Sequence, residues 1–142
     1  MRAWIGLLSM MMVAGVYAQG LPGVENSARA RVNYMLNCQG CHGAEGAGTH
    51  DGAVPTMKDF VGRFLTVEDG REFLVRVPGS ANAALGDAAL AELLNWMLPQ
   101  ISPAQMPPDF QPYTAAEVGG LRSNPLDDVE AERARLISRM AP

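Results

Sequence analysis

Apolar residues recur with a helical period along much of the chain. The clearest run predicts an amphipathic helix from Asp87 to Leu98, which Pro99 is expected to stop. Its apolar residues fall at positions i, i+3, i+4, i+7 and i+8, namely Leu90, Leu93, Leu94, Met97 and Leu98. A stripe of this width is typical of a helix that buries one face in a core.

Residues suited to helix ends predict two further helices. Ser27 can cap a helix whose apolar positions continue through Leu36. Thr114 and Glu117 form a Thr-x-x-Glu capping box, which opens a shorter helix that ends before Pro125.

The remaining segments give one more helix, one loop and one ambiguous stretch. A last helix is expected from Asp127 to Arg139, since its acids lie early and its arginines late, as the helix dipole favours. Four glycines between Gly43 and Gly52 predict a loop. The stretch from Glu72 to Val77 fits a strand by alternation and a helix by spacing, and Pro78 is expected to end either one.

The first residues read as an export signal. Arg2 supplies a positive start, Ile5 to Val13 an apolar stretch, and Val16-Tyr17-Ala18 a cleavage site between small residues. We therefore expect residues 1–18 to be a signal peptide, residues 19–125 one domain and residues 126–142 a helical tail. An uncleaved N-terminal anchor is the alternative interpretation.

Composition narrows the range of partners. The 142 residues carry a formal net charge of −4, which argues against nucleic acid. No second apolar segment is long enough to span a bilayer, so no stable membrane insertion is expected.

The residues Cys38-Gln39-Gly40-Cys41-His42 contain the only two cysteines of the chain. A C-x-x-C-H run is typical of covalent c-type haem attachment, in which two thiols join the porphyrin and the histidine binds its iron. A zinc site would need two more ligands, and His50 is the only other histidine. A thioredoxin-like disulfide would need a strand and helix pattern that is absent here, and a structural disulfide would not need the adjacent histidine.

From this motif onward the chain resembles the monohaem class I cytochromes c. Val54-Pro55-Thr56-Met57 with Gly62-Arg63 is similar to the family's Gly-Pro-x-Leu…Gly-Arg segment. The resemblance implies that the Pro55 carbonyl accepts a hydrogen bond from the second nitrogen of His42. It also implies that Arg63 approaches a haem propionate, with an ordinary solvated arginine as the alternative.

A second match concerns the distal ligand of the iron. Met106-Pro107-Pro108, ahead of the capped helix, is similar to the family's methionine loop, which implies that Met106 is the sixth ligand. Met57 is the alternative methionine, although the match places it as a residue lining the haem pocket. His50 could instead give two histidine ligands, but its glycine-rich loop favours an exposed position.

The resemblance implies an all-α domain wrapped around one covalently bound haem, with an extra C-terminal helix. The expected function is that of a periplasmic one-electron carrier and not an enzyme, with a periplasmic dehydrogenase as donor and an oxidase or reductase as acceptor. The alternative is a haem protein with an open coordination position, either a gas sensor or a small peroxidase. A peroxidase would want a distal histidine and arginine, and only His50 is available for the first role.

Overall fold

A computed structural model describes residues 20–140, and every regular element in that range is helical. The all-α prediction is therefore confirmed, while the predicted signal peptide lies outside the described residues. The α-helices are α1 (Ser27–Asn37), α2 (Gln39–His42), α3 (Gly70–Arg76), α4 (Pro78–Ala81), α5 (Asp87–Ile101), α6 (Ala115–Arg122) and α7 (Val129–Ser138). The 3₁₀ helices are η1 (Val61–Thr66) and η2 (Pro103–Gln105).

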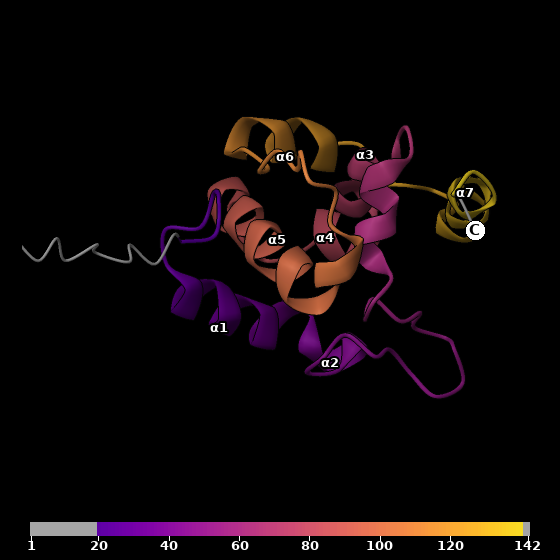
Figure 1. The fold of residues 1–142 in the computed structure, drawn as a ribbon, viewed down its shortest axis with the longest axis horizontal. Helices are drawn as coiled ribbons and strands as arrows, with labels where there is room; N and C mark the ends of the chain where they lie inside the picture. Colours follow the sequence, from indigo (N-terminus) through magenta and orange to yellow (C-terminus); the bar gives the residue numbers. More distant parts are fainter. Residues whose placement is uncertain (1–19, 141–142) are drawn as a thin grey trace, which may run out of the picture.

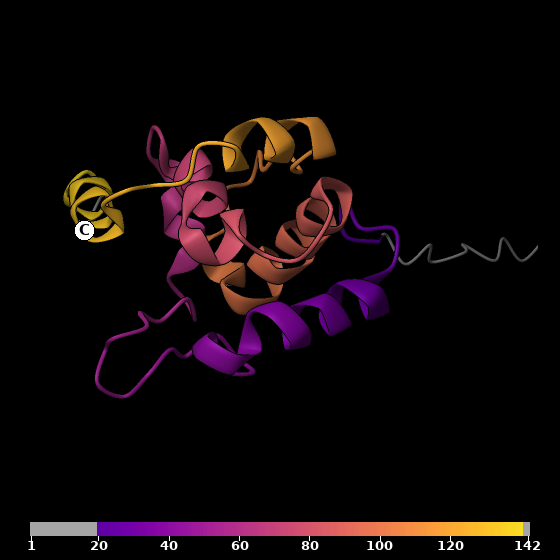
Figure 2. The same cartoon turned by 180° about the vertical axis from the view of Figure 1, so that it is seen from behind.

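Helix α5 lies at the centre of the body, between α1 and α6 (Figure 1). Its five apolar residues predicted from the sequence are all 5% exposed or less, and each such burial stabilises the fold by about 1.5–3 kcal/mol. Seen from behind, α1 crosses the bottom of the body and continues into α2 (Figure 2). The central helix thus supports the segment that carries the two cysteines.

The structure corrects the predicted end of α5. The helix passes Pro99 and ends at Ile101, so the prediction that Pro99 stops it is wrong. Proline removes one backbone hydrogen bond, yet the Ser102 N–H still donates to the Leu98 carbonyl at 3.0 Å. Ile101 is buried as well, and its packing offsets the bond that Pro99 cannot make.

The N-terminal caps agree with the sequence to within one residue. Asn26, not Ser27, caps α1, because its side chain accepts the Arg29 N–H at 2.9 Å. Both residue types suit this position, so the sequence alone does not choose between them. The capping box of Thr114 and Glu117 is confirmed, with both of its hydrogen bonds present at the start of α6.

The ambiguous stretch is helical and belongs to α3. Residues 73–75 are all buried, which suits a helix enclosed on several sides and not an alternating strand. Gly70 is required at the first position, since a Cβ there would lie 1.9 Å from the Phe64 carbonyl oxygen. The helix ends before Pro78 as predicted, and Pro78 then opens the single turn of α4.

Glu92 on α5 is a buried acidic residue that binds the backbone just before α1. The Glu92 carboxylate accepts the backbone N–H groups of Glu25 at 3.0 Å and Asn26 at 2.8 Å. It also accepts two hydrogen bonds from the Arg29 guanidinium, each at 2.8 Å. A buried charge needs such partners, and here they join α1 to the central helix.

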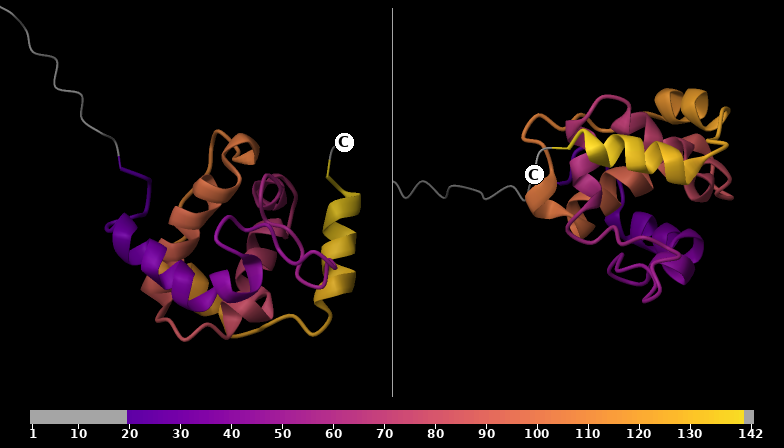
Figure 3. Two further views of the ribbon diagram at one scale, coloured as in Figure 1. Left: turned by 90° about the horizontal axis from the view of Figure 1, so that it is seen from below. Right: turned by 90° about the vertical axis from the view of Figure 1, so that its right-hand side faces the viewer.

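The predicted C-terminal helix is confirmed as α7, which is slightly shorter at both ends than the range expected. It lies along the side of the body next to α3 (Figure 3). Asp128 caps it by accepting the Ala131 N–H at 2.9 Å, and Leu136 is fully buried. Within residues 20–140, no helix has both the length and the apolar character that crossing a membrane requires.

Candidate functional site

The two cysteines and the histidine of the motif lie on one helical turn. Cys38 is the C-terminal cap of α1, and its carbonyl accepts the N–H groups of Cys41 at 3.2 Å and His42 at 3.0 Å. Residues three and four positions apart share a face of a helix, so this turn holds both thiols beside the imidazole. Both cysteines are free thiols, Cys38 half-buried against the core and Cys41 exposed.

The surroundings of the His42 ring favour its neutral form, which is the form that binds a metal. Burial lowers the pKa of His42, and the Pro55 carbonyl beside the ring opposes this shift more weakly. Nδ1 is buried and has no hydrogen-bond partner among the described residues. Buried polar atoms are rarely left unpaired, and the Pro55 carbonyl, which acts on this ring, is the acceptor at hand for an Nδ1 proton.

A short loop brings Pro55 to His42. The Gly48 N–H donates to the His42 carbonyl at 2.9 Å, and a Cβ on Gly48 would lie 2.3 Å from the Val54 carbonyl oxygen. Gly48 also has a φ of +74°, which side chains disfavour. Glycine is therefore needed here for the two arms of the loop to meet, as the glycine-rich stretch suggested without identifying the position.

Tyr34 supports the same loop from α1. Its hydroxyl donates to the Gly43 carbonyl at 2.7 Å, directly after the histidine. Burial raises the pKa of Tyr34 to about 12, so the hydroxyl keeps its proton. The sequence did not reveal this bond, because a buried tyrosine implies that its hydroxyl has an acceptor without identifying which one.

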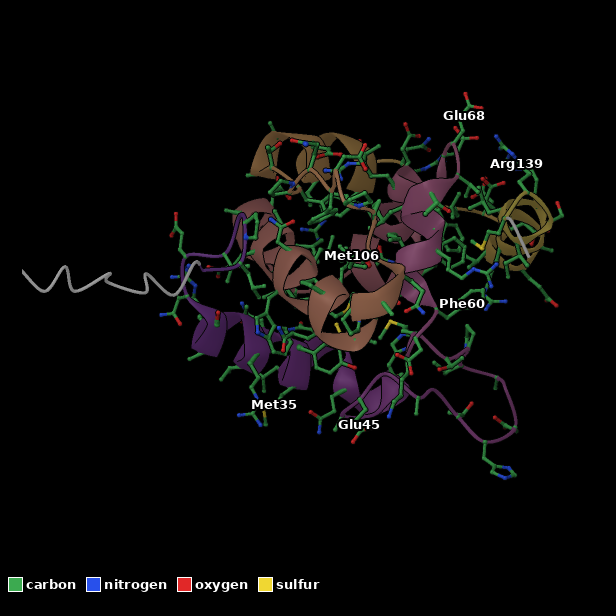
Figure 4. All side chains as sticks on the ribbon, in the orientation of Figure 1. Met35, Glu45, Phe60, Glu68, Met106 and Arg139 are labelled. Atoms are coloured by element: carbon green, nitrogen blue, oxygen red, sulfur yellow. The ribbon has the colours of Figure 1, made fainter. Side chains whose placement is uncertain are left out.

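Met106 and Arg63 are brought together by a close contact between η1 and η2. The Gly62 N–H donates to the Ser102 hydroxyl at 3.1 Å, and a Cβ on Gly62 would lie 2.9 Å from the Gln105 carbonyl. Arg63 and Met106 then line one hollow of the surface, and Met106 lies near the middle of the view in Figure 4. Buried Ser102 is a supporting residue that the sequence did not reveal.

The alternative ligands Met57 and His50 do not line the hollow that contains Met106. Met57 is half-buried, and its N–H donates to the Gly46 carbonyl at 2.7 Å, which ties it to the loop that leaves His42. His50 is exposed. Among residues 20–140, no group of three or more His, Cys, Asp or Glu side chains is placed to hold a metal ion.

These residues fit a covalently bound haem. Two thiols flank an imidazole on one turn, and a thioether and a guanidinium line a separate hollow. The iron of a haem supplies a ferric–ferrous couple for one-electron transfer. A helical domain with this set of groups defines the class of c-type haem proteins.

Comparison with known proteins agrees. The family model for cytochrome c matches residues 27–121, and the chain belongs to the cytochrome c family, whose members transfer electrons through haem c. Cytochrome c-552 of Thermus thermophilus is 34% identical over 119 residues, which cover 70% of this chain and 90% of that protein. A second cytochrome c-552 of the same species is also 34% identical over 119 residues, with 80% of its length covered. No solved structure gives a significant match.

Proposed function

We propose that this protein is a periplasmic one-electron carrier in which Cys38 and Cys41 form thioether bonds to haem and His42 binds the iron. The single helical turn that holds Cys38, Cys41 and His42 together, in a chain of the cytochrome c family, carries the proposal. With the iron on Nε2, Nδ1 would carry the ring proton and donate it to the Pro55 carbonyl, which already acts on the ring. Such a bond fixes the ring and raises its basicity as a ligand.

The second axial ligand is assigned to Met106. Met57 is bonded to the loop that starts at His42, on the proximal side of the site. Met106 follows η2, where its N–H donates to the Pro103 carbonyl at 3.4 Å, and it lines the hollow together with Arg63. A ligand opposite to His42 has to come from a different wall, so Met106 fits this role and Met57 fits the pocket lining. Arg63 would then bind a haem propionate.

If His42 and Met106 both bound the iron, no position would be left on it for a substrate, which would suit a carrier and not an enzyme. Family membership implies redox partner proteins. We assign a periplasmic dehydrogenase as donor and an oxidase or reductase as acceptor, and we take residues 1–18 as the signal that directs export. The net negative charge favours partners with a basic docking face.

A spectroscopic experiment tests the ligand set. The holoprotein is prepared with Met106→Ala and Met57→Ala as separate variants, and the weak far-red band of ferric iron with a thioether ligand is recorded. We expect the band in the wild type and in Met57→Ala, and its loss in Met106→Ala. Loss in Met57→Ala alone would reverse the assignment, and rapid carbon monoxide binding by the wild type would favour the open-coordination alternative.

A further inference from the structure

Trp96 is the one residue between Leu90 and Leu98 on α5 that is not buried. Its ring packs against Tyr34 of α1, with 6.0 Å between the ring centroids and 54° between the ring planes. Aromatic pairs at this separation attract each other beyond the area that they bury. Tyr34 is buried and Trp96 is half-buried, so the pair leads from the core to the surface.

Trp96 lines a surface hollow of about 360 Å³ that Tyr34 also reaches. The loop that leaves His42 forms part of its wall through Ala44 and Glu45. Glu45 lies beside α2 in Figure 4, and its carboxylate pairs with Lys58, which lines the hollow as well. A partner seated in this hollow would therefore contact Trp96 and the segment just after the histidine together.

A continuous set of contacts connects His42 to Trp96. The peptide bond joins His42 to Gly43, and the Gly43 carbonyl accepts the Tyr34 hydroxyl at 2.7 Å. Tyr34 in turn packs against Trp96. Electrons tunnel far more readily through covalent bonds, short hydrogen bonds and ring contacts than across open space. Because Tyr34 is buried, this connection runs through protein until it reaches the hollow at Trp96.

We propose that Trp96 is a point at which electrons enter and leave this protein, with a one-electron redox protein as the partner in the hollow. This inference rests on the proposed binding of iron by His42. One electron passes between the iron and the partner by way of His42, Tyr34 and Trp96, which themselves are neither oxidised nor reduced, and no proton moves. Half-exposed tryptophan also suits a protein partner, because tryptophan is enriched among the residues that dominate protein interfaces.

The test places an electron donor in the hollow of the holoprotein. Gln100 lies one helical turn after Trp96 and lines the same hollow, so Gln100→Cys can carry a ruthenium polypyridyl label there. Ala116→Cys, at an exposed position on α6, carries the control label. The two motif cysteines are consumed by haem attachment, so each introduced cysteine is the one free thiol. A laser flash then drives one electron from the label to ferric iron.

The rate of this step is compared with and without Trp96→Leu at each label position. With the label on Gln100→Cys, Trp96→Leu should slow the electron severalfold, and Trp96→Phe, which keeps an aromatic ring, should give an intermediate rate. With the label on Ala116→Cys, neither substitution should change the rate. Equal slowing at both label positions would mean that Trp96 acts on the iron site as a whole, and would overturn the proposal.

Fluorescence gives a readout that does not depend on electron transfer. The chain has two tryptophans, and removal of a signal peptide that contains Trp4 leaves Trp96 as the only one. Its fluorescence lifetime should fall when acrylamide is added to the unlabelled holoprotein, because a ring that lines a hollow is open to a small quencher. A lifetime that acrylamide does not change would show that no partner can touch Trp96, and would refute the proposal.

The outcomes separate this proposal from the one before it. Equal rates for Trp96 and Trp96→Leu with the label on Gln100→Cys would remove the route through Trp96, while haem attachment would stand. Covalent haem is checked separately by the mass and the visible spectrum of the wild type. A wild-type protein without covalent haem would overturn both proposals.

Discussion

Replacing Glu92 by glutamine tests the junction between α1 and α5. The two oxygens of Glu92 accept four hydrogen bonds, three at Oε1 and one at Oε2. In Glu92→Gln the amide oxygen can take over the bonds of Oε1. The amide NH₂ group then faces the Nε–H of Arg29, so a charge-assisted bond is replaced by two opposed donors.

The expected loss of stability follows from the bond between Arg29 Nε–H and Glu92 Oε2, which the substitution removes. A hydrogen bond to a charged group contributes about 1.5–3 kcal/mol. The Arg29 side chain is 52% exposed, and solvent screening reduces the value toward the lower end. We therefore expect Glu92→Gln to lower the free energy of unfolding by about 1.5 kcal/mol at neutral pH.

The pH dependence gives a second readout. Hydrogen bonds from Arg29 lower the pKa of Glu92, against the opposing effect of burial. A carboxyl whose folded pKa is depressed contributes stability above its unfolded pKa, near 4.3, and loses it as the pH falls toward the folded value. The difference between wild type and Glu92→Gln should therefore shrink as the pH falls below about 4.

Guanidinium chloride unfolding of the holoprotein, followed by far-UV circular dichroism at neutral and acidic pH, measures both quantities. Glu72→Gln, at an exposed position on α3, is the control and should be neutral within about 0.5 kcal/mol. A Glu92→Gln variant as stable as this control at neutral pH would refute the assigned bond. A difference that persists unchanged in acid would refute the role of the charge.

Three further predictions concern the loop and the caps. Gly48→Ala should impair covalent haem incorporation or lower the free energy of unfolding by more than about 1 kcal/mol, because the new Cβ would clash with the Val54 carbonyl. Gly79→Ala is the control, since the space around Gly79 is open, and it should change neither quantity. Equal haem content and stability in the two variants would contradict this reasoning. Tyr34→Phe should lower the free energy of unfolding by about 1 kcal/mol through loss of the bond to the Gly43 carbonyl, measured by denaturation, and an unchanged midpoint would remove that bond from consideration. Thr114→Ala should cost about 1 kcal/mol at the start of α6, whereas Ala116→Ser on the same exposed turn should cost less than half as much; equal losses would count against the cap.

The sequence predicted the elements that depend on local spacing. The apolar stripe of α5 and the capping box of α6 were identified because each signal lies within one or two helical turns. The end of α5 was wrong because the burial of Ile101 depends on tertiary packing, which a proline rule cannot include.

The candidate site likewise combines local features that the sequence predicts with long-range contacts that it does not. The C-x-x-C-H motif specifies its own geometry, since five consecutive residues make one turn. Other contacts join residues that are distant in the sequence or belong to separate elements. Tyr34 bonds to Gly43 across 9 positions, Gly62 contacts Gln105 of η2 across 43, and Arg133 lies beside Phe60 across 73. No periodicity reports such pairs, and the roles assigned to Pro55, Arg63 and Met106 stay predictions for the experiments above.

Two hydrogen bonds between Thr49 and Val54 close the loop and separate its tip from the histidine. The Thr49 N–H donates to the Val54 carbonyl, and the Val54 N–H donates to the Thr49 hydroxyl, each at 2.9 Å. Residues 50–53 beyond this closure are all exposed. Lengthening such a tip adds only about 0.6 kcal/mol of closure entropy for each doubling. A spectroscopic label or an affinity peptide inserted there should leave the proposed iron ligands undisturbed, so that the protein can be followed while it carries haem.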